Sequence, residues 1–148
     1  KLVLVGDGPD KERVLEYIEK KRIKNVDLEG AQTDVARYYK TASIVCLTSF
    51  YEGWGMSLTE GMSYGCIPFT FSNYGAAYDI IDDGINGCLI KAYDETTYAM
   101  RLEGLMRNES KRKMMANSAI EKVKIFSVDK IIPRWELLFE TLLKNNVY

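Results

Sequence analysis

Short apolar segments alternate with charged, amphipathic segments along this chain, and this alternation constrains the fold more than any other feature. The apolar segments have the length of β-strands, and the segments between them have helical periodicity. Strands that alternate with helices form right-handed βαβ units. The sequence therefore predicts an α/β fold with a parallel, doubly wound sheet, whose expected strands are Leu2–Val5, Val26–Gly30, Ser43–Ser49, Cys66–Phe71 and Gly87–Ile90.

Two prolines refine this expectation. Pro68 lies early in a predicted strand and favours an edge or a bulge there. Pro133 lies inside the last predicted helix and indicates a kink or a late start, because proline lacks an N–H.

The predicted helices are Lys11–Arg22, a helix capped by Thr33 or Asp34 that ends near Lys40, Ser57–Tyr64, Ala76–Ile81, Glu95–Met106, Ser110–Lys124 and a last helix that ends near Leu143.

Length and composition favour one domain over residues 1–148. A chain of 148 residues that is 47% hydrophobic can bury one sizeable core. The net charge of −1 argues against a dedicated nucleic-acid binder. The longest apolar runs, such as Ile44–Leu47, are too short to span a bilayer, so no transmembrane segment is expected.

The chain contains no histidine, which excludes Ser-His-Asp and Cys-His sites and histidine-based metal centres built from this chain alone. Cys46, Cys66 and Cys88 are widely spaced within apolar stretches. This pattern favours buried thiols in a reducing compartment over a disulfide or metal framework. The chain starts at Lys1, directly before an apolar strand, which indicates a piece of a longer protein.

The segment YEGWGMSLTE (residues 51–60) carries two glutamates around a glycine–aromatic–glycine turn, directly after a predicted strand. Ligands of parallel sheets bind at the carboxyl ends of the strands, so this turn is expected at the ligand edge. Gly53 and Gly55 let the backbone turn sharply. The helix that follows directs its unpaired N–H groups to the same edge, which is a site for a phosphate or diphosphate.

Glu60 is expected about one turn into that helix, where its carboxylate can accept hydrogen bonds from two vicinal ribose hydroxyls. Glu52 precedes the helix and fits the sugar of a nucleoside diphosphate sugar. Two interpretations need no ligand: Ser57-x-x-Glu60 also matches a capping box, and Glu52 also fits an exposed loop carboxylate. Trp54 is expected to be a half-buried anchor of the turn.

The segment GDGPD (residues 6–10) also follows a predicted strand and opens a helix. Lys11 stands where the dinucleotide fingerprint G-x-G-x-x-G needs its third glycine. We therefore interpret this segment as a tight turn rather than as a loop that binds the phosphates of a nucleotide.

The stretch TSFYEGWGMSLTEGMSYGCIP (residues 48–68) closely resembles the signature of the family 4 retaining glycosyltransferases. In that signature two glutamates separated by seven residues lie in a pattern similar to S-x-x-E-G-F-G-x-x-x-x-E-A-M-A-x-G-x-P. The flanking segments VGDGPD, NVDLEGA, DDGINGCLI and RWELLFETLL also agree. The resemblance implies a GT-B architecture of two Rossmann-like halves, of which this chain is the C-terminal, donor-binding half with a helical C-terminal segment.

The resemblance also implies roles for single residues. Glu60 maps onto the glutamate that binds the ribose hydroxyls, and Glu52 maps onto the one that contacts the donor sugar near the reacting carbon. Gln32, just after the glycine of NVDLEG, is carried over as a residue that holds the base. The backbone groups expected to contact sugar hydroxyls and the diphosphate belong to Trp54, Gly55, Met56 and Ser57.

The chain departs from the family pattern in four ways. The segment GAAYD (residues 75–79) stands where the family often has Gly-Gly-x-x-Glu, and Gly61 stands at an alanine position. The family supplies an arginine and a lysine upstream of VGDGP, and this chain starts after them. The acceptor-binding half is missing as well. The basic residues nearest to the turn in sequence are Lys40 and Lys91.

The function implied by the resemblance is metal-independent transfer of a sugar, with retention, from a nucleoside diphosphate sugar to a glycan or lipid-linked acceptor. A UDP-sugar is expected on family frequency, and a GDP-sugar stays open. The acceptor is expected to bind through the missing half, so this fragment alone is expected to be inactive. Polysaccharide biosynthesis in the cytoplasm is the expected setting, with peripheral membrane association left open. A non-catalytic sugar-nucleotide-binding domain and a GT-B nucleotide-sugar epimerase remain alternatives.

Overall fold

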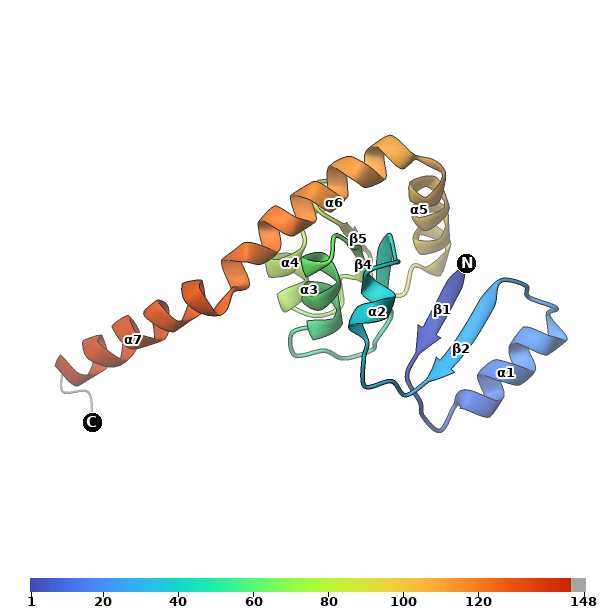
Figure 1. Cartoon of the computed structure of the whole chain (residues 1–148), viewed down its shortest axis with the longest axis horizontal. Coiled ribbons are helices and arrows are strands. Elements are labelled where there is room, and N and C mark those ends of the chain that lie inside the picture. Colours follow the sequence, from blue (N-terminus) through green and yellow to red (C-terminus); the bar gives the residue numbers. More distant parts are fainter. Residues whose placement is uncertain (145–148) are drawn as a thin grey trace. The chain divides into compact units, whose positions relative to one another are not determined.

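The computed structural model describes residues 1–144, and the chain divides into two compact units, Lys1–Tyr38 and Tyr39–Tyr148. Figure 1 shows the elements of both units in chain order. All paired strands run parallel and alternate with helices, so the predicted α/β fold class is confirmed. A single domain over residues 1–148 stays a prediction.

The first unit contains a βαβ motif. Strand β1 (Leu2–Val5) pairs in parallel with β2 (Val26–Gly30), and helix α1 (Lys11–Lys20) connects them. The GDGPD segment forms the turn before α1. There the carboxylate of Asp7 accepts a hydrogen bond from the Gly8 N–H at 2.8 Å and pairs with Lys11 at 3.1 Å. A short helix, α2 (Ala36–Tyr39), follows β2.

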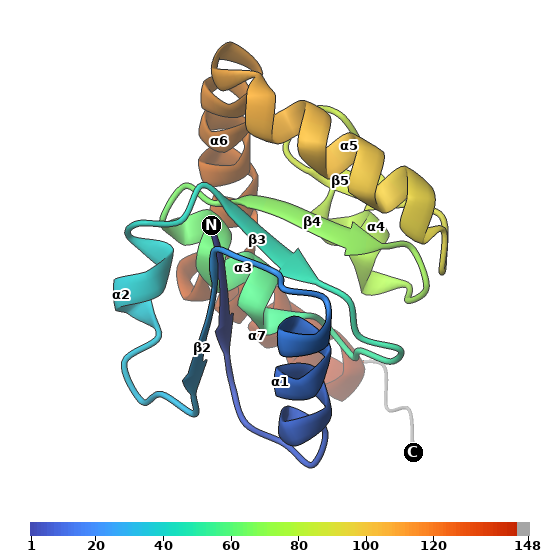
Figure 2. The ribbon, with the colours of Figure 1, turned by 90° about the vertical axis from the view of Figure 1, so that its right-hand side faces the viewer.

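The second unit is built on a three-stranded parallel sheet. Its strands are β3 (Ile44–Leu47), β4 (Ile67–Phe71) and β5 (Cys88–Ile90), in the order β3-β4-β5. Figure 2 shows these strands side by side, with α5 on one face. The helices of this unit are α3 (Met56–Ser63), α4 (Ala76–Ile80), α5 (Glu95–Arg107), α6 (Glu109–Val123) and α7 (Val128–Lys144), with a 3-10 turn η1 at Lys124–Phe126.

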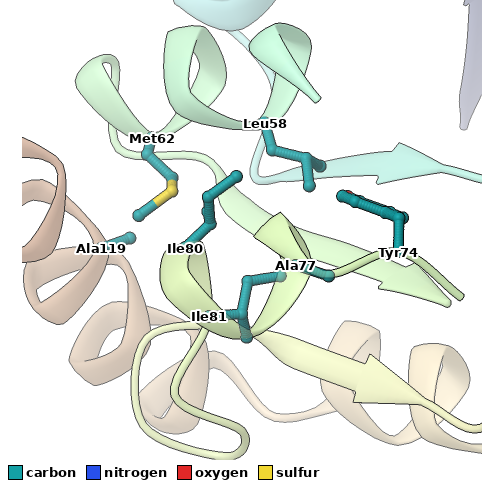
Figure 3. Packing of buried hydrophobic residues seen from close by; sticks show 7 residues of the cluster. All are labelled: Leu58, Met62, Tyr74, Ala77, Ile80, Ile81 and Ala119. Carbon is teal, nitrogen blue, oxygen red and sulfur yellow. The ribbon is translucent and has the colours of Figure 1, made fainter. Parts of the chain in front are cut away.

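Each face of this sheet has its own core, because alternate residues of a strand point to opposite faces. Ile67, Phe69 and Phe71 of β4 pack on one face with residues of β5, α5 and α6. On the other face, α3 and α4 bury a second cluster together with Ala119 of α6 (Figure 3). The sheet is therefore covered on both faces at β4, whose residues are all buried. The strand Ser43–Ser49, for which the sequence predicted such cover, is only partly buried at β3, where Cys46 is exposed. The second cluster comprises Leu58, Met62, Tyr74, Ala77, Ile80, Ile81 and Ala119.

The turn before β5 is held by polar contacts from several elements. Buried Asn86 accepts a hydrogen bond from the Asp82 N–H at 2.6 Å and donates one to the Ile80 carbonyl at 2.9 Å. Arg101 of α5 pairs with Asp83 at 2.6 Å. Lys122 of α6 pairs with Asp82 at 2.9 Å. These contacts fix the segment that leads into β5 to both α5 and α6.

Pro68 contradicts its prediction, because it lies in β4, the central strand, and within a regular register opposite Val45. The N–H of the preceding residue, Ile67, donates to Ser43 on the β3 side. Backbone donors of a parallel strand alternate between its two neighbours, so the absent N–H of Pro68 would face β5. The pairing of β4 with β5 begins only at Phe69 and Cys88, so no ladder hydrogen bond is lost.

The predictions for Pro133 and for the cysteines each hold only in part. Helix α7 begins at Val128 and continues through Pro133, which excludes the late start, and the kink stays a prediction. Cys46 is exposed on the edge strand β3, whereas Cys66 and Cys88 are buried as expected. Within residues 1–144, β1 pairs with β2 in the first unit and β3, β4 and β5 pair in the second, and a single sheet through both units stays a prediction.

Among residues 1–144, none of the helices combines the length and the apolar character that crossing a lipid bilayer requires.

We predict that Gly61→Ala destabilises the protein, although alanine is the family residue at this position. A Cβ there would lie 2.8 Å from Cγ1 of Val45, below any normal contact distance. Overpacking costs about 1–3 kcal/mol, which exceeds the gain of about 1 kcal/mol from replacing glycine in a helix. Urea unfolding of the variant should show a net loss in the free energy of unfolding.

The companion variant Val45→Ala tests the cause. In a double-mutant cycle, Gly61→Ala should cost less when Val45 is also alanine, because the contact with Cγ1 is removed while the contact with Cβ of Val45, at 3.1 Å, remains. A Gly61→Ala variant that is more stable than the parent on its own would contradict this explanation.

Candidate functional site

The loop that joins β3 to α3 is shaped by Gly55. This residue is the N-cap of α3, has a left-handed backbone (φ 84°) and is buried. A Cβ at this position would lie 3.0 Å from the Tyr74 hydroxyl and 3.2 Å from Cδ2 of Leu47. Two constraints therefore require glycine at this position: the left-handed backbone angle, and the lack of room for a side chain beside Tyr74 and Leu47.

The first turn of α3 has no side-chain cap within residues 1–144. The Leu58 N–H donates to the carbonyl of the N-cap residue, Gly55, at 2.9 Å, which is the first hydrogen bond of the helix itself. Ser57 is the second residue of the helix rather than its N-cap, so the Ser57-x-x-Glu60 capping box does not form. The N–H groups at the start of α3 and the carboxylate of Glu60 are consequently left for other partners.

Glu60 projects from α3 as an exposed residue. Its carboxylate accepts one long hydrogen bond, 3.4 Å, from the hydroxyl of Tyr39. The Tyr39 ring stacks on Tyr64, with ring centroids 6.0 Å apart. Burial, reinforced by the charge of Glu60, raises the pKa of Tyr39 to about 12. Tyr39 therefore stays a neutral hydrogen-bond donor beside Glu60 across the physiological pH range.

Glu52 lies in the loop and is half-buried. Its carboxylate makes no hydrogen bond or ion pair with any of residues 1–144. Burial raises the pKa of the Tyr74 hydroxyl, the Thr70 hydroxyl opposes this shift, and the charge of Glu52 adds to it. Glu52 is thus a half-buried carboxylate without a protein partner, close enough to Tyr74 to influence its ionisation.

Trp54 anchors the loop, as the sequence predicted. Its indole is half-buried, meets the Phe126 ring edge-on at 5.0 Å and packs against the cluster of Figure 3. The buried part of the side chain therefore faces the core, and a ligand contact by the backbone of Trp54 stays a prediction. Of the neighbouring candidates, Met56 is exposed and Ser57 is half-buried.

Asn73 and Tyr74 support the loop from the carboxyl end of β4, and the sequence reasoning missed both. The side-chain amide of Asn73 donates to the carbonyls of Ser49 and Phe50, each at 2.9 Å. The oxygens Oδ1 of Asn73 and Oη of Tyr74 are buried without a well-formed hydrogen bond to any of residues 1–144. Both residues directly follow a predicted strand, and this position could have identified them, because ligands of parallel sheets bind at the carboxyl ends of the strands.

Gln32 belongs to the first unit. Its amide group donates to the Glu29 carbonyl at 2.6 Å and accepts a hydrogen bond from Arg37 at 2.9 Å. A role of Gln32 in holding a nucleotide base stays a prediction, as do the roles of Glu52, Glu60 and the backbone of residues 54–57. Within residues 1–144 no group of three or more Cys, Asp or Glu side chains is arranged to hold a metal ion.

Comparison with known proteins gives one consistent result. The family model described as "Glycosyl transferases group 1" matches residues 1–122. The chain is 33% identical over 135 residues to a GalNAc-alpha-(1->4)-GalNAc-alpha-(1->3)-diNAcBac-PP-undecaprenol alpha-1,4-N-acetyl-D-galactosaminyltransferase of Campylobacter jejuni. It is 27% identical over 148 residues to the poly(glycerol-phosphate) alpha-glucosyltransferase of Bacillus subtilis. These matches cover 91% and 99% of this chain but only 37% and 22% of the two relatives.

Solved structures agree with the family. A crystal structure of TarM superposes with a TM-score of 0.87 at 28% identity, over 94% of this chain and 28% of TarM. A mutant of S. aureus TarM, equally similar, was solved in complex with UDP. Anabaena Alr3699/HepE, solved with UDP-glucose, superposes with a TM-score of 0.83 over 95% of this chain and 40% of that protein. At 22% identity this last match shows the fold alone.

We predict that Gly55→Ala destabilises the protein by about 1–3 kcal/mol, because a left-handed alanine costs about 1–2 kcal/mol and its methyl group meets Tyr74 and Leu47. Gly53→Ala is the matched control. Gly53 lies in the same loop, has no positive φ and has open space around its Cβ position.

Urea unfolding measures both variants. Gly53→Ala should change the free energy of unfolding by less than about 0.5 kcal/mol. Equal losses for the two variants would show that the loop tolerates no side chain anywhere, and would remove the special role given to Gly55.

Proposed function

Because this chain belongs to the group 1 glycosyl transferases, we propose that it is the donor-binding part of a metal-independent, retaining glycosyltransferase. The observation that carries the proposal is the start of α3, which no side chain within residues 1–144 caps and which is flanked by Glu52 and Glu60, two carboxylates available to a ligand. This arrangement offers N–H donors to a diphosphate and one acceptor group on each side of it.

The nucleotide binds at α3 in this proposal. The N–H groups of its first turn and the positive end of its dipole contact the diphosphate. Glu60 accepts hydrogen bonds from the two ribose hydroxyls, and the neutral Tyr39 hydroxyl holds its carboxylate in place. Gln32 contacts the base. UDP is the proposed nucleotide, supported by the TarM complex with UDP.

Glu52 faces the donor sugar in the transfer step. The bond between the anomeric carbon and the diphosphate oxygen breaks, and positive charge develops on the sugar ring. Glu52 stabilises that charge, and the backbone of residues 54–57 orients the sugar and the departing diphosphate. An acceptor hydroxyl attacks from the same face, and its proton passes to the leaving diphosphate. The products are a glycoside of retained configuration and UDP.

The acceptor is proposed to be a glycan or a lipid-linked sugar, in line with the undecaprenol-linked and polymeric acceptors in the names of the two relatives. The chain spans less than two fifths of either relative, so the main part of the acceptor site and the basic groups that balance the diphosphate charge are assigned to further parts of a longer protein. One helix N-terminus carries only about half a positive charge. The isolated chain should therefore bind UDP weakly and transfer no sugar.

We predict that Glu60→Ala weakens UDP binding by about 1–3 kcal/mol, the value of charge-assisted hydrogen bonds that lose their acceptor. NMR titration of the parent chain with UDP should shift the amides of residues 53–60. The variant should reach the same shifts only at a UDP concentration roughly tenfold higher or more. The free energy of unfolding should stay within about 0.5 kcal/mol of the parent, because Glu60 is exposed and caps no helix.

Glu136→Ala is the matched control, an exposed helical glutamate on α7. It should leave both UDP affinity and stability unchanged. A Glu60→Ala variant that loses stability but keeps its affinity for UDP would return Glu60 to a structural role.

Glu52→Gln should separate an enzyme from a non-catalytic binding domain. In the longer protein that contains this chain, we expect kcat to fall about a hundredfold or more, which is roughly 2.7 kcal/mol of transition-state stabilisation. KM for the donor should change little, because a carboxylate matched to developing charge acts mainly in the transition state. Steady-state kinetics with the donor sugar nucleotide, beside UDP affinity of the same variant, measures both. An unchanged kcat would make Glu52 an ordinary loop carboxylate.

A further inference from the structure

Aromatic side chains gather where the three strands of the second unit end. Phe71 is the last residue of β4, Phe50 follows the end of β3, and Tyr93 follows the end of β5. The Phe50 and Tyr93 rings lie 5.4 Å apart with their planes inclined by 33°, and Phe71 lies 6.3 Å from Tyr93. Because the strands are parallel neighbours, this row stands at the edge of the sheet where ligands bind.

Phe50 and Tyr93 form the outer, exposed part of the row and are called the aromatic platform below. Phe50 is 80% exposed and Tyr93 is 58% exposed, whereas Phe71 beneath them is buried. Rings of this size usually bury most of their surface. Two exposed rings in contact with each other, on a buried aromatic base, are a feature that folding alone does not require.

The backbone holds both rings in place. Tyr93 has a left-handed backbone, φ 62°, which a bulky residue seldom adopts without a compensating gain. It is held between β5 and the start of α5, where the Asp94 N–H donates to the Lys91 carbonyl at 3.0 Å. The Phe50 carbonyl accepts a hydrogen bond at 2.9 Å from the Asn73 side chain. These hydrogen bonds fix the backbone from which the two rings project, and the rings contact each other and the Phe71 ring beneath Tyr93.

The position of the platform indicates its ligand. Phe50 lies two residues before Glu52. Its ring contacts the ring of Tyr93, which follows β5, so the platform lies toward the β5 side of the sheet. Glu60 contacts Tyr39, which precedes β3 on the opposite side. A donor whose ribose lies at Glu60 and whose sugar lies at Glu52 therefore points toward the platform, and the next group along this line is the acceptor.

We propose that Phe50 and Tyr93 form a stacking platform for a pyranose ring of the acceptor. This inference rests on the proposed function, since it takes the direction of the donor from it. The C–H bonds on one face of a pyranose make an apolar surface, which packs on aromatic rings while the hydroxyls at the ring edge stay hydrated. The bond-forming acceptor hydroxyl is then held beside Glu52, and no covalent step involves either ring.

Helix α7 carries a natural control for this interpretation. Trp135 and Phe139 are also exposed and lie 5.7 Å apart with their planes inclined by 34°, nearly the geometry of the platform. They stand on one face of a helix and have neither an adjacent carboxylate of the site nor a strand end beneath them. If exposed rings alone bound sugars, both pairs would do so equally.

The test is saturation-transfer NMR on the 148-residue chain, with and without UDP. The probes are the methyl β-pyranosides of glucose, galactose and N-acetylglucosamine, with glycerol as an acyclic polyol. We expect ring-proton saturation for at least one pyranoside, none for glycerol, and amide shifts at residues 50 and 93. Phe50→Ala should weaken pyranoside binding about tenfold, Phe50→Trp should retain it, and Phe139→Ala should leave it unchanged.

The outcomes separate the inference from the proposed function. Absence of saturation from all three pyranosides, or equal losses in Phe50→Ala and Phe139→Ala, overturns the platform. Phe50→Ala should also leave the ratio of UDP-glucose affinity to UDP affinity unchanged. A loss specific to UDP-glucose makes the platform a contact of the donor sugar and overturns its assignment to the acceptor. Failure of UDP to bind the parent chain counts against the proposed function alone, because the pyranosides are also tested without UDP.

Discussion

The left-handed backbone of Gly55 is the constraint on which the candidate site depends. It lets the chain turn from β3 into α3 while Leu47 and Tyr74 fill the space below the turn. Because Gly55 takes the N-cap position and has no side chain, no N-cap side chain occupies the first N–H groups of α3. A helix that began at a serine N-cap three residues before Glu60 would have engaged both its first N–H groups and the glutamate. The glycine therefore keeps two kinds of ligand contact available at once.

The sequence predicted the order and type of the elements well, because strands covered on both faces and amphipathic helices leave strong periodic signals. It also located the loop from Glu52 to Glu60 through its glycines and its position after a strand. It could not decide between a capping box and a ligand carboxylate at Glu60, since that depends on which residue takes the N-cap position. Asn73 and Pro68 are further residues whose roles could not be predicted from local sequence. The role of each follows from the register and neighbours of β4, which local sequence does not contain.

Contacts on two sides of the second unit's sheet, the side of α3 and the side of β5, hold the loops of the candidate site in place. On the side of α3, Trp54 packs against Phe126, which follows α6 directly in the 3-10 turn. On the side of β5, Arg101 of α5 and Lys122 of α6 hold Asp83 and Asp82. Burial opposes ionisation of Asp83, but the hydrogen bonds from Arg101 and the Leu89 N–H prevail and lower its pKa. The long C-terminal helices thus stabilise the loops at a distance from any ligand.

Pro68 gives the sheet an uneven stability along its length. At its position β4 offers no N–H toward β5, and the two strands pair only from Phe69 onward. Near the carboxyl end the ladder is complete and is extended by the Ser72 N–H, which donates to the Ile90 carbonyl at 2.7 Å. Backbone pairing between β4 and β5 is therefore concentrated at the carboxyl ends of the strands, the edge that carries Glu52, Phe50 and Tyr93. At the amino end the side-chain contacts of Asn86, Asp83 and Asp82 hold β5 in place of ladder hydrogen bonds.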